Sequence, residues 1–144
     1  MPGPSVLDIT QGVAMENPKK LAITSRSAGD IVVFDIDGEL SRWASALPTL
    51  SELVKSQMSS GKDRILLNLE KTGFVDSFGV GEIITSFISL RNSGGALKLC
   101  RIPDKLLLVF KITGLEKVLT ICPTEEAAIE DFANPPAPGQ SKPR

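Results

Sequence analysis

The stretch Val75-Asp76-Ser77-Phe78-Gly79-Val80-Gly81 lies near the middle of the chain and joins two apolar segments. The segment before it, Arg64 to Glu70, is an almost continuous apolar run, which predicts a strand covered on both faces. The segment after it, Val80 to Leu90, repeats apolar residues with helical spacing. The stretch is therefore expected to be a strand-to-helix turn, with Ser77 as the N-cap residue of the helix.

Ser77 has two interpretations at this turn. Its hydroxyl can cap the helix by accepting a hydrogen bond from a free N–H group of the first turn. The same N–H groups and the positive end of the helix dipole also favour an anion, so a kinase could phosphorylate the hydroxyl without disrupting the fold. Judged on these residues alone, a plain capping pair of Asp76 and Ser77 stays open.

Composition limits the classes of function. The 144 residues fit one domain, and the net charge of −1 argues against nucleic acid and anionic membrane surfaces as partners. The longest purely apolar run, Leu106 to Phe110, is too short to cross a bilayer, so no direct membrane insertion is expected. The N-terminus lacks the basic start and apolar stretch of a signal peptide, which predicts a cytoplasmic, soluble protein.

The inventory of catalytic groups is thin. The chain has no histidine, which excludes Ser–His and Cys–His catalysis and removes the commonest neutral metal ligand. Cys100 and Cys122 lie in predicted strands without metal-ligand spacing, and are interpreted as small buried hydrophobic residues. Asp37, Glu39 and Glu70 lie near strand ends, where solvated loop charges are commoner than metal or acid–base sites. We therefore expect no enzyme activity, no cofactor and no metal site.

The order of the predicted elements indicates the fold class. The expected strands cover Lys20 to Ser27, Ile31 to Ile36, Arg64 to Glu70, Ala96 to Ile102 and Val118 to Cys122. The first two are joined by a turn signal at Ala28-Gly29-Asp30. The helices are expected between Ser41 and Gly61, from Val80 to Leu90, after Pro103 and after Thr124, which can cap the last of them. The apolar side of the helix after Pro103 is expected to consist of Leu106, Leu107, Phe110 and Ile112. This order predicts an α/β fold with a mostly parallel sheet of about five strands, opened by an antiparallel hairpin, and with about four helices. The domain is expected to cover residues 19–132, between an arm (1–18) and a disordered Pro-rich tail (133–144).

The helix after the turn has an expected core stripe and an expected solvent face. The stripe consists of Val80, Ile83, Ile84, Phe87 and Ile88. Phe78 falls on the opposite face, where it either packs back on the preceding loop as a hydrophobic staple or contacts a partner. Gly79-Val80-Gly81 is only a fragment of a nucleotide-binding G-x-G-x-x-G pattern, because Ile84 replaces its last glycine.

Four segments together resemble the STAS domain of anti-sigma factor antagonists. These segments are Ile36-Asp37-Gly38-Glu39-Leu40, then Ile65-Leu66-Leu67-Asn68-Leu69 followed by Phe74-Val75-Asp76-Ser77, then Ile112-Thr113-Gly114-Leu115-Glu116-Lys117-Val118-Leu119, and finally Thr124-Glu125-Glu126-Ala127. They occur in the order of the family, and the resemblance spans Leu21 to Phe132. It implies a bacterial signalling protein that regulates sigma-factor-dependent transcription by binding.

The resemblance also implies a site. Many members read D-S-S-G or D-S-T-G, with the second hydroxyl residue phosphorylated, whereas stressosome scaffold proteins read D-S-F with the serine after Asp as acceptor. This chain matches the second version, which points to Ser77. Ser41 stands where many antagonists carry an Asp that holds the partner. The implied partner-binding residues are Gly38, Ser41, Asp76, Ser77, Phe78, Gly79, Gly81 and Glu82.

The implied partner is an anti-sigma factor that is also a serine kinase of the histidine-kinase-like ATPase type. It would bind the unphosphorylated chain, supply the ATP and release the chain after phosphorylating Ser77. A stressosome-like scaffold, a transporter-accessory STAS protein and a small nucleotide-binding protein stay open as alternatives, as does a homodimer.

Overall fold

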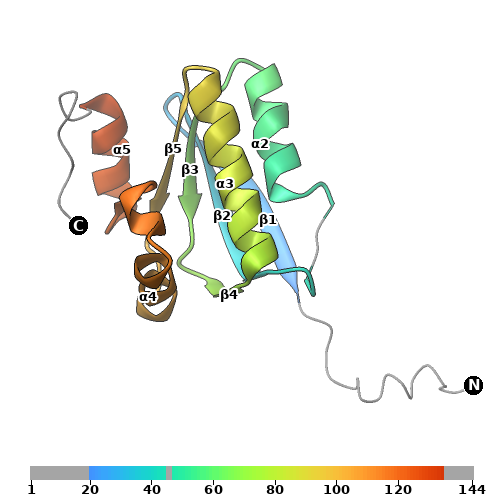
Figure 1. Ribbon diagram of the computed structural model, residues 1–144. Helices are drawn as coiled ribbons and strands as arrows, with labels where there is room; N and C mark the ends of the chain where they lie inside the picture. Colours follow the sequence, from blue (N-terminus) through green and yellow to red (C-terminus); the bar gives the residue numbers. More distant parts are fainter. Residues whose placement is uncertain (1–19, 45–46, 135–144) are drawn as a thin grey trace, which may run out of the picture.

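The computed structural model describes residues 20–44 and 47–134 (Figure 1). The predicted arm, residues 1–18, lies outside this part of the chain, as do residues 135–144 of the predicted tail. Ala133 was assigned to the tail by the sequence prediction, but it is the last residue of the final helix.

A long antiparallel hairpin opens the fold, as the sequence predicts. Strands β1 (Leu21–Ala28) and β2 (Ile31–Leu40) pair along their whole common length. Gly29 supplies the left-handed residue of the turn between them, with φ of +65°. β2 runs four residues past its predicted end at Ile36, because its last residues pair with a further strand.

Three strands extend the sheet on the other side of β2 with parallel pairing. They are β3 (Arg64–Asn68), β5 (Ala96–Cys100) and β6 (Thr120–Cys122), and the order across the sheet is β1-β2-β3-β5-β6. The predicted fold class is therefore confirmed: an α/β fold whose mostly parallel sheet begins with an antiparallel hairpin.

A sixth strand, β4 (Thr72–Val75), was not predicted. It pairs in parallel with the end of β2, off the main path of the sheet. Its four residues are too few for an alternating pattern, and Gly73 reads as a turn signal. The side chain of Thr72 is buried and its Oγ1 donates to the Ile36 carbonyl at 2.9 Å, which ties β4 to β2.

Helices cover both faces of the sheet (Figure 1). They are α2 (Leu50–Ser59), α3 (Ser77–Asn92), α4 (Asp104–Ile112) and α5 (Glu125–Ala133), with a short 3-10 helix at Leu115–Lys117. Alternate residues of β2 separate the two faces: Val32, Phe34 and Ile36 pack with α2, α3 and α4, whereas Ile31 and Val33 pack with α5.

Two predicted packing faces differ from the structure. In α3 the buried positions are Gly79, Ile83, Ser86 and Leu90, while Ile88 is 41% exposed, so its assignment to the core stripe was wrong. In α4 the expected core residues include Ile112, which is 75% exposed. In both helices the pattern of large apolar residues is wider than the face that the sheet covers. Within the described residues, no helix is long and apolar enough to cross a membrane.

Helix α5 is held to the sheet at both ends by ion pairs. Near its end, Asp131 accepts from the Lys98 ammonium group of β5 at 2.8 Å, and both side chains are buried. At its start, Glu125 pairs with Arg26 of β1 at 2.7 Å. The cap of this helix was predicted correctly: Thr124 Oγ1 accepts a hydrogen bond from the Ala127 N–H group at 3.0 Å.

Candidate functional site

The strand-to-helix turn has Asp76, not Ser77, as the N-cap of α3, so the predicted capping residue was wrong by one position. Asp76 has extended backbone angles, and its Oδ1 accepts a hydrogen bond from the Gly79 N–H group at 3.0 Å. Ser77 is the first residue of the helix. Its hydroxyl is not required for capping, because the carboxylate of Asp76 already has that role.

The second carboxylate oxygen of Asp76 holds the loop that follows β2. Oδ2 accepts a hydrogen bond from the Arg42 N–H group at 3.1 Å and lies 3.9 Å from the Arg42 Nε. Burial acts to raise the pKa of Asp76, but hydrogen bonds from the Gly79 and Arg42 backbones outweigh it and hold that pKa below its ordinary value. Asp76 is thus ionised at neutral pH and joins two segments of the site.

Ser77 is exposed on the first turn of a helix of 16 residues. The first four N–H groups of any α-helix have no partner within the helix, and the positive end of its dipole lies among them. Asp76 takes the hydrogen bond of one of these groups, from Gly79. The position therefore suits a hydroxyl that becomes an anion, because a phosphoryl group there meets partial positive charge and solvent.

Two of the predicted contact glycines have structural roles. A Cβ on Gly79 would overlap the Leu40 carbonyl oxygen, so the absence of a side chain lets α3 start directly against the end of β2. Gly38 has φ of +124°, and a Cβ there would overlap the Lys20 carbonyl oxygen. Gly81 differs from both: it is exposed, and a Cβ there would meet no atom within 4 Å beyond its chain neighbours and the backbone of its own helix, so it is a place where another surface can approach.

The side chains of Ser41 and Glu82 form hydrogen bonds with other residues of this chain. Ser41 is 1% exposed, and its Oγ accepts a hydrogen bond from the Trp43 N–H group at 3.2 Å. Ser41 therefore stabilises the loop that follows β2. Both carboxylate oxygens of Glu82 accept hydrogen bonds from Ser51, from its N–H group at 3.0 Å and its hydroxyl at 3.3 Å. Glu82 thereby joins α3 to the start of α2.

Three exposed aromatic side chains lie on the segments that build the turn. We call Trp43, Phe74 and Phe78 the aromatic rim; they are 71%, 45% and 40% exposed. Trp43 follows the Arg42 that is bonded to Asp76, Phe74 lies in β4 just before the turn, and Phe78 is in the first turn of α3. Of the three, sequence reasoning proposed only Phe78 as a contact residue. The only tryptophan of the chain, set between charged and small residues, was a signal that could have identified Trp43.

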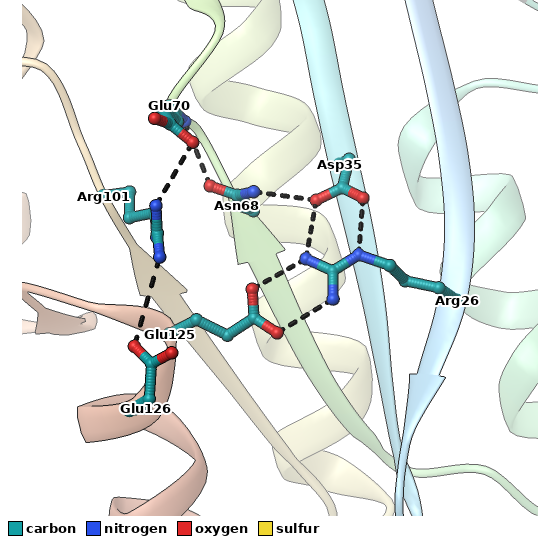
Figure 2. A network of polar contacts seen from close by, with 7 residues as sticks. All are labelled: Arg26, Asp35, Asn68, Glu70, Arg101, Glu125 and Glu126. Carbon is teal, nitrogen blue, oxygen red and sulfur yellow. Dashed lines mark hydrogen bonds and ion pairs between the residues drawn. The ribbon is translucent and has the colours of Figure 1, made fainter.

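A second polar cluster lies on the sheet face that carries α5, away from the turn (Figure 2). The Arg26 guanidinium pairs with Asp35 of β2 and with Glu125 of α5, each through two hydrogen bonds of 2.7–3.0 Å. Asn68 donates to Asp35 at 2.7 Å. The hydrogen bonds from Arg26 hold the pKa values of Asp35 and Glu125 below their ordinary range. The cluster therefore fixes the start of α5 against β1 and β2.

A cavity of about 380 Å³ lies beside this cluster and is lined by Asp37, Glu70 and Lys71, among others. Asp37 and Glu70 are two of the three carboxylates that the sequence places near strand ends. Glu70 pairs with Arg101 at 3.3 Å, as Figure 2 shows. Within the described ranges, 20–44 and 47–134, no group of three or more Cys, Asp and Glu residues could hold a metal ion.

A mixed sheet with helices on both faces and a serine at the mouth of α3 defines a small α/β module with a solvent-facing hydroxyl. The sequence model of the STAS domain matches residues 22–128, and the chain therefore belongs to the STAS domain family. It is 29% identical over 105 residues to the anti-sigma-B factor antagonist of Bacillus subtilis (strain 168), covering 73% of this chain and 93% of that protein. The resemblance to anti-sigma factor antagonists is thus confirmed.

Solved structures agree with this assignment. The Bacillus cell fate determinant SpoIIAA in its phosphorylated form is 26% identical with a TM-score of 0.60, covering 77% of this chain and 99% of that one. An anti-sigma factor antagonist from Mycobacterium paratuberculosis has a TM-score of 0.70 at 15% identity, covering 79% of this chain and 95% of that one. The second likeness shows the shared fold.

Proposed function

We propose that this chain is an anti-sigma factor antagonist whose binding is switched by phosphorylation of Ser77. Unphosphorylated, it binds an anti-sigma factor that is also a serine kinase of the histidine-kinase-like ATPase type, and thereby frees the sigma factor. The observation that carries the proposal is the exposed Ser77 hydroxyl on the first turn of α3, next to the aromatic rim. The relatives that bear the name of anti-sigma factor antagonists support the same function.

The aromatic rim supplies anchors for a partner. Large aromatic side chains dominate the energy of many protein interfaces when they become fully desolvated. Trp43, Phe74 and Phe78 are exposed and lie on the three segments that build the turn, and we propose that one partner surface contacts them together. Gly81 adds a spot without a side chain on the same first turns of α3, where the partner backbone can come close. The partner surface that fits these side chains is apolar and lies close to the ATP that the partner binds.

Phosphoryl transfer assigns separate roles to the two proteins. The Ser77 Oγ attacks the γ-phosphorus of ATP held by the partner, a new O–P bond forms, the bond to the β,γ-bridging oxygen breaks, and ADP leaves. The hydroxyl proton passes to a base of the partner. Asp76 is a weak base, because hydrogen bonds from the Gly79 and Arg42 N–H groups stabilise its carboxylate and, against the effect of burial, hold its pKa below the ordinary value. Its role is to hold the turn so that Ser77 is presented.

The phosphoryl group ends the binding for a physical reason. It adds about −1.5 to −2 charges at neutral pH. The open helix start accommodates this charge, whereas an apolar interface would bury it without partners, at a high cost in free energy. The fold is therefore kept while the complex is lost.

The test compares variants of the full chain in affinity capture from the native host, with captured proteins identified by mass spectrometry. Ser77→Ala is expected to keep a kinase-like partner, and Ser77→Asp to lose it by tenfold or more while unfolding at the parent's temperature. Ser56→Asp, which adds the same charge at an exposed position of α2, is the matched control and is expected to keep the partner. The same partners at the same yield with Ser77→Asp, or an unfolded Ser77→Asp variant, would contradict the proposal.

Two measurements address the alternative functions. Calorimetric titration with ATP and GTP tests the small nucleotide-binding protein, and we expect no heat of binding for the isolated chain. Mass determination in solution tests the scaffold: a monomer or dimer agrees with the antagonist, whereas a large particle agrees with a stressosome-like assembly.

A further inference from the structure

We propose that Arg42 is the residue of this chain that pairs with the phosphoryl group on Ser77, and that it reaches this group by releasing Asp76. The inference rests on the proposed phosphorylation of Ser77 and adds the internal response to it. Arg42 lies next to the turn, although 34 positions separate it from Asp76 in the sequence. Its N–H group donates to Asp76 Oδ2 at 3.1 Å.

The backbone of Arg42 is held in place, whereas its side chain is mostly exposed to solvent. The hydrogen bond to Asp76 holds its main chain beside the turn, while its side chain is 61% exposed. The Nε lies 3.9 Å from the Asp76 oxygen, which is a long and loose ion-pair distance. Ser77 is the next residue, with its Cα about 3.8 Å from that of Asp76. A rotation of the flexible arginine side chain is thus enough to bring the guanidinium from one acidic group to the other.

A phosphoryl group attracts the guanidinium more strongly than the carboxylate does. It carries about two negative charges and three acceptor oxygens, and it accepts two parallel N–H bonds from the fork of an arginine. The Asp76 carboxylate loses little stabilisation when the guanidinium leaves, because the Gly79 and Arg42 N–H groups continue to donate hydrogen bonds to its two oxygens. The exchange therefore gains a short, charge-assisted pair and leaves no buried acceptor unsatisfied.

The exchange changes the surface as well as the charge. Trp43 follows Arg42 directly, is 71% exposed, and has its N–H group bonded to Ser41. Because Trp43 is the residue after Arg42, a movement of the Arg42 guanidinium toward Ser77 changes the charge close to the Trp43 side chain. On this inference, phosphorylation alters the surroundings of one member of the aromatic rim in addition to adding charge at Ser77.

The first test measures the second pKa of phosphoserine at position 77 by ³¹P NMR. The phosphoserine is introduced by genetic encoding, so no kinase is required. A nearby guanidinium favours the dianion, and we expect the phosphate pKa in the parent to lie about half a unit or more below that in Arg42→Ala. Arg42→Lys, which keeps the charge, is expected to fall between them. Arg91→Ala removes a cation from the last turn of the same helix and should equal the parent.

The second test uses fluorescence. The chain has one tryptophan and no tyrosine, so its intrinsic emission reports on Trp43 alone. We expect phosphoserine at position 77 to shift the emission of the parent and not that of Arg42→Ala. Arg42→Ala keeps the backbone N–H group that bonds Asp76 and loses only an exposed side chain, so it is expected to fold. Equal phosphate pKa values in the parent and in Arg42→Ala would overturn the inference.

The readouts separate this inference from the proposed function. The phosphate pKa depends only on the chain itself, whereas partner capture by the phosphorylated chain depends on the anti-sigma factor. A lowered phosphate pKa with undiminished partner capture would remove the proposed switch and leave the pairing by Arg42 standing. A normal phosphate pKa with lost capture would keep the switch and remove the role of Arg42.

Discussion

Replacing Asp76 by alanine tests the claim that one carboxylate holds together the two segments of the site. In the structure its Oδ1 accepts from the Gly79 N–H group and its Oδ2 from the Arg42 N–H group, at 3.0 and 3.1 Å. Asp76→Ala removes both acceptors at once. The expected result is a less stable protein in which the start of α3 and the loop after β2 are no longer tied.

The size of the effect follows from these two bonds. Loss of a side-chain N-cap costs about 1 kcal/mol. The Asp76 side chain is only 16% exposed, so water replaces the second acceptor incompletely, and that loss costs about 1 kcal/mol more. We expect the free energy of unfolding to fall by about 2 kcal/mol, which corresponds to a fall in Tm of about 6–10 °C for a domain of this size.

Thermal unfolding followed by circular dichroism measures this difference. Thr124→Ala is the matched control, because Thr124 caps α5 with a single hydrogen bond to the Ala127 N–H group, far from the turn. It is expected to cost about 1 kcal/mol. If Asp76→Ala costs no more than Thr124→Ala, the Asp76 carboxylate does not hold the Arg42 loop, and the reasoning about the site is refuted.

The pH dependence gives an independent check on Asp76. Its pKa in the folded protein is lowered, so its carboxylate stabilises the fold fully at pH values above the unfolded pKa of about 3.9. The contribution is lost as the pH falls through the lower, folded pKa. Asp76→Asn keeps an acceptor but carries no charge. We expect the parent to be more stable than Asp76→Asn at neutral pH, and the difference to shrink below about pH 4.

Two further variants test how the surrounding fold is held. Lys98→Met leaves the buried Asp131 without the ammonium group 2.8 Å away, and we expect a loss of about 3–5 kcal/mol in urea denaturation, most of it recovered by the double variant Lys98→Met with Asp131→Leu. A single variant as stable as the double would contradict this. Gly79→Ala puts a Cβ against the Leu40 carbonyl oxygen and is expected to cost about 2 kcal/mol or more, whereas Gly81→Ala, which meets no atom, should cost nothing measurable by thermal unfolding.

Local patterns were sufficient for most of the fold. The apolar run before the turn and the helical spacing after it predicted β3 and α3, and the turn signal at Ala28-Gly29-Asp30 predicted the hairpin. These features depend on residues that are close in sequence, where periodicity and turn chemistry act directly. The wrong cap at Ser77 has the same origin, because Asp and Ser are equally good N-caps and only the backbone angles decide between them.

Features that depend on contacts between distant residues were missed. β4 is too short to have a pattern of its own and exists because the end of β2 offers it a pairing edge. Ile88 and Ile112 are apolar at helical spacing, yet both are exposed, because the sheet covers only part of each helix. Burial is a property of the packed layers, and periodicity indicates only which residues are available for it.

The sequence by itself determined the order of the elements apart from β4, the family to which the chain belongs and the turn that carries Ser77. Only the tertiary structure decided what surrounds that serine. Arg42 lies 34 positions before Asp76 along the chain, and the two meet because β4 pairs with the end of β2 and brings the loop after β2 against the start of α3. Such pairing joins segments through backbone hydrogen bonds that leave no local sequence pattern, which is why Arg42, Trp43 and Phe74 could not be assigned to the site beforehand.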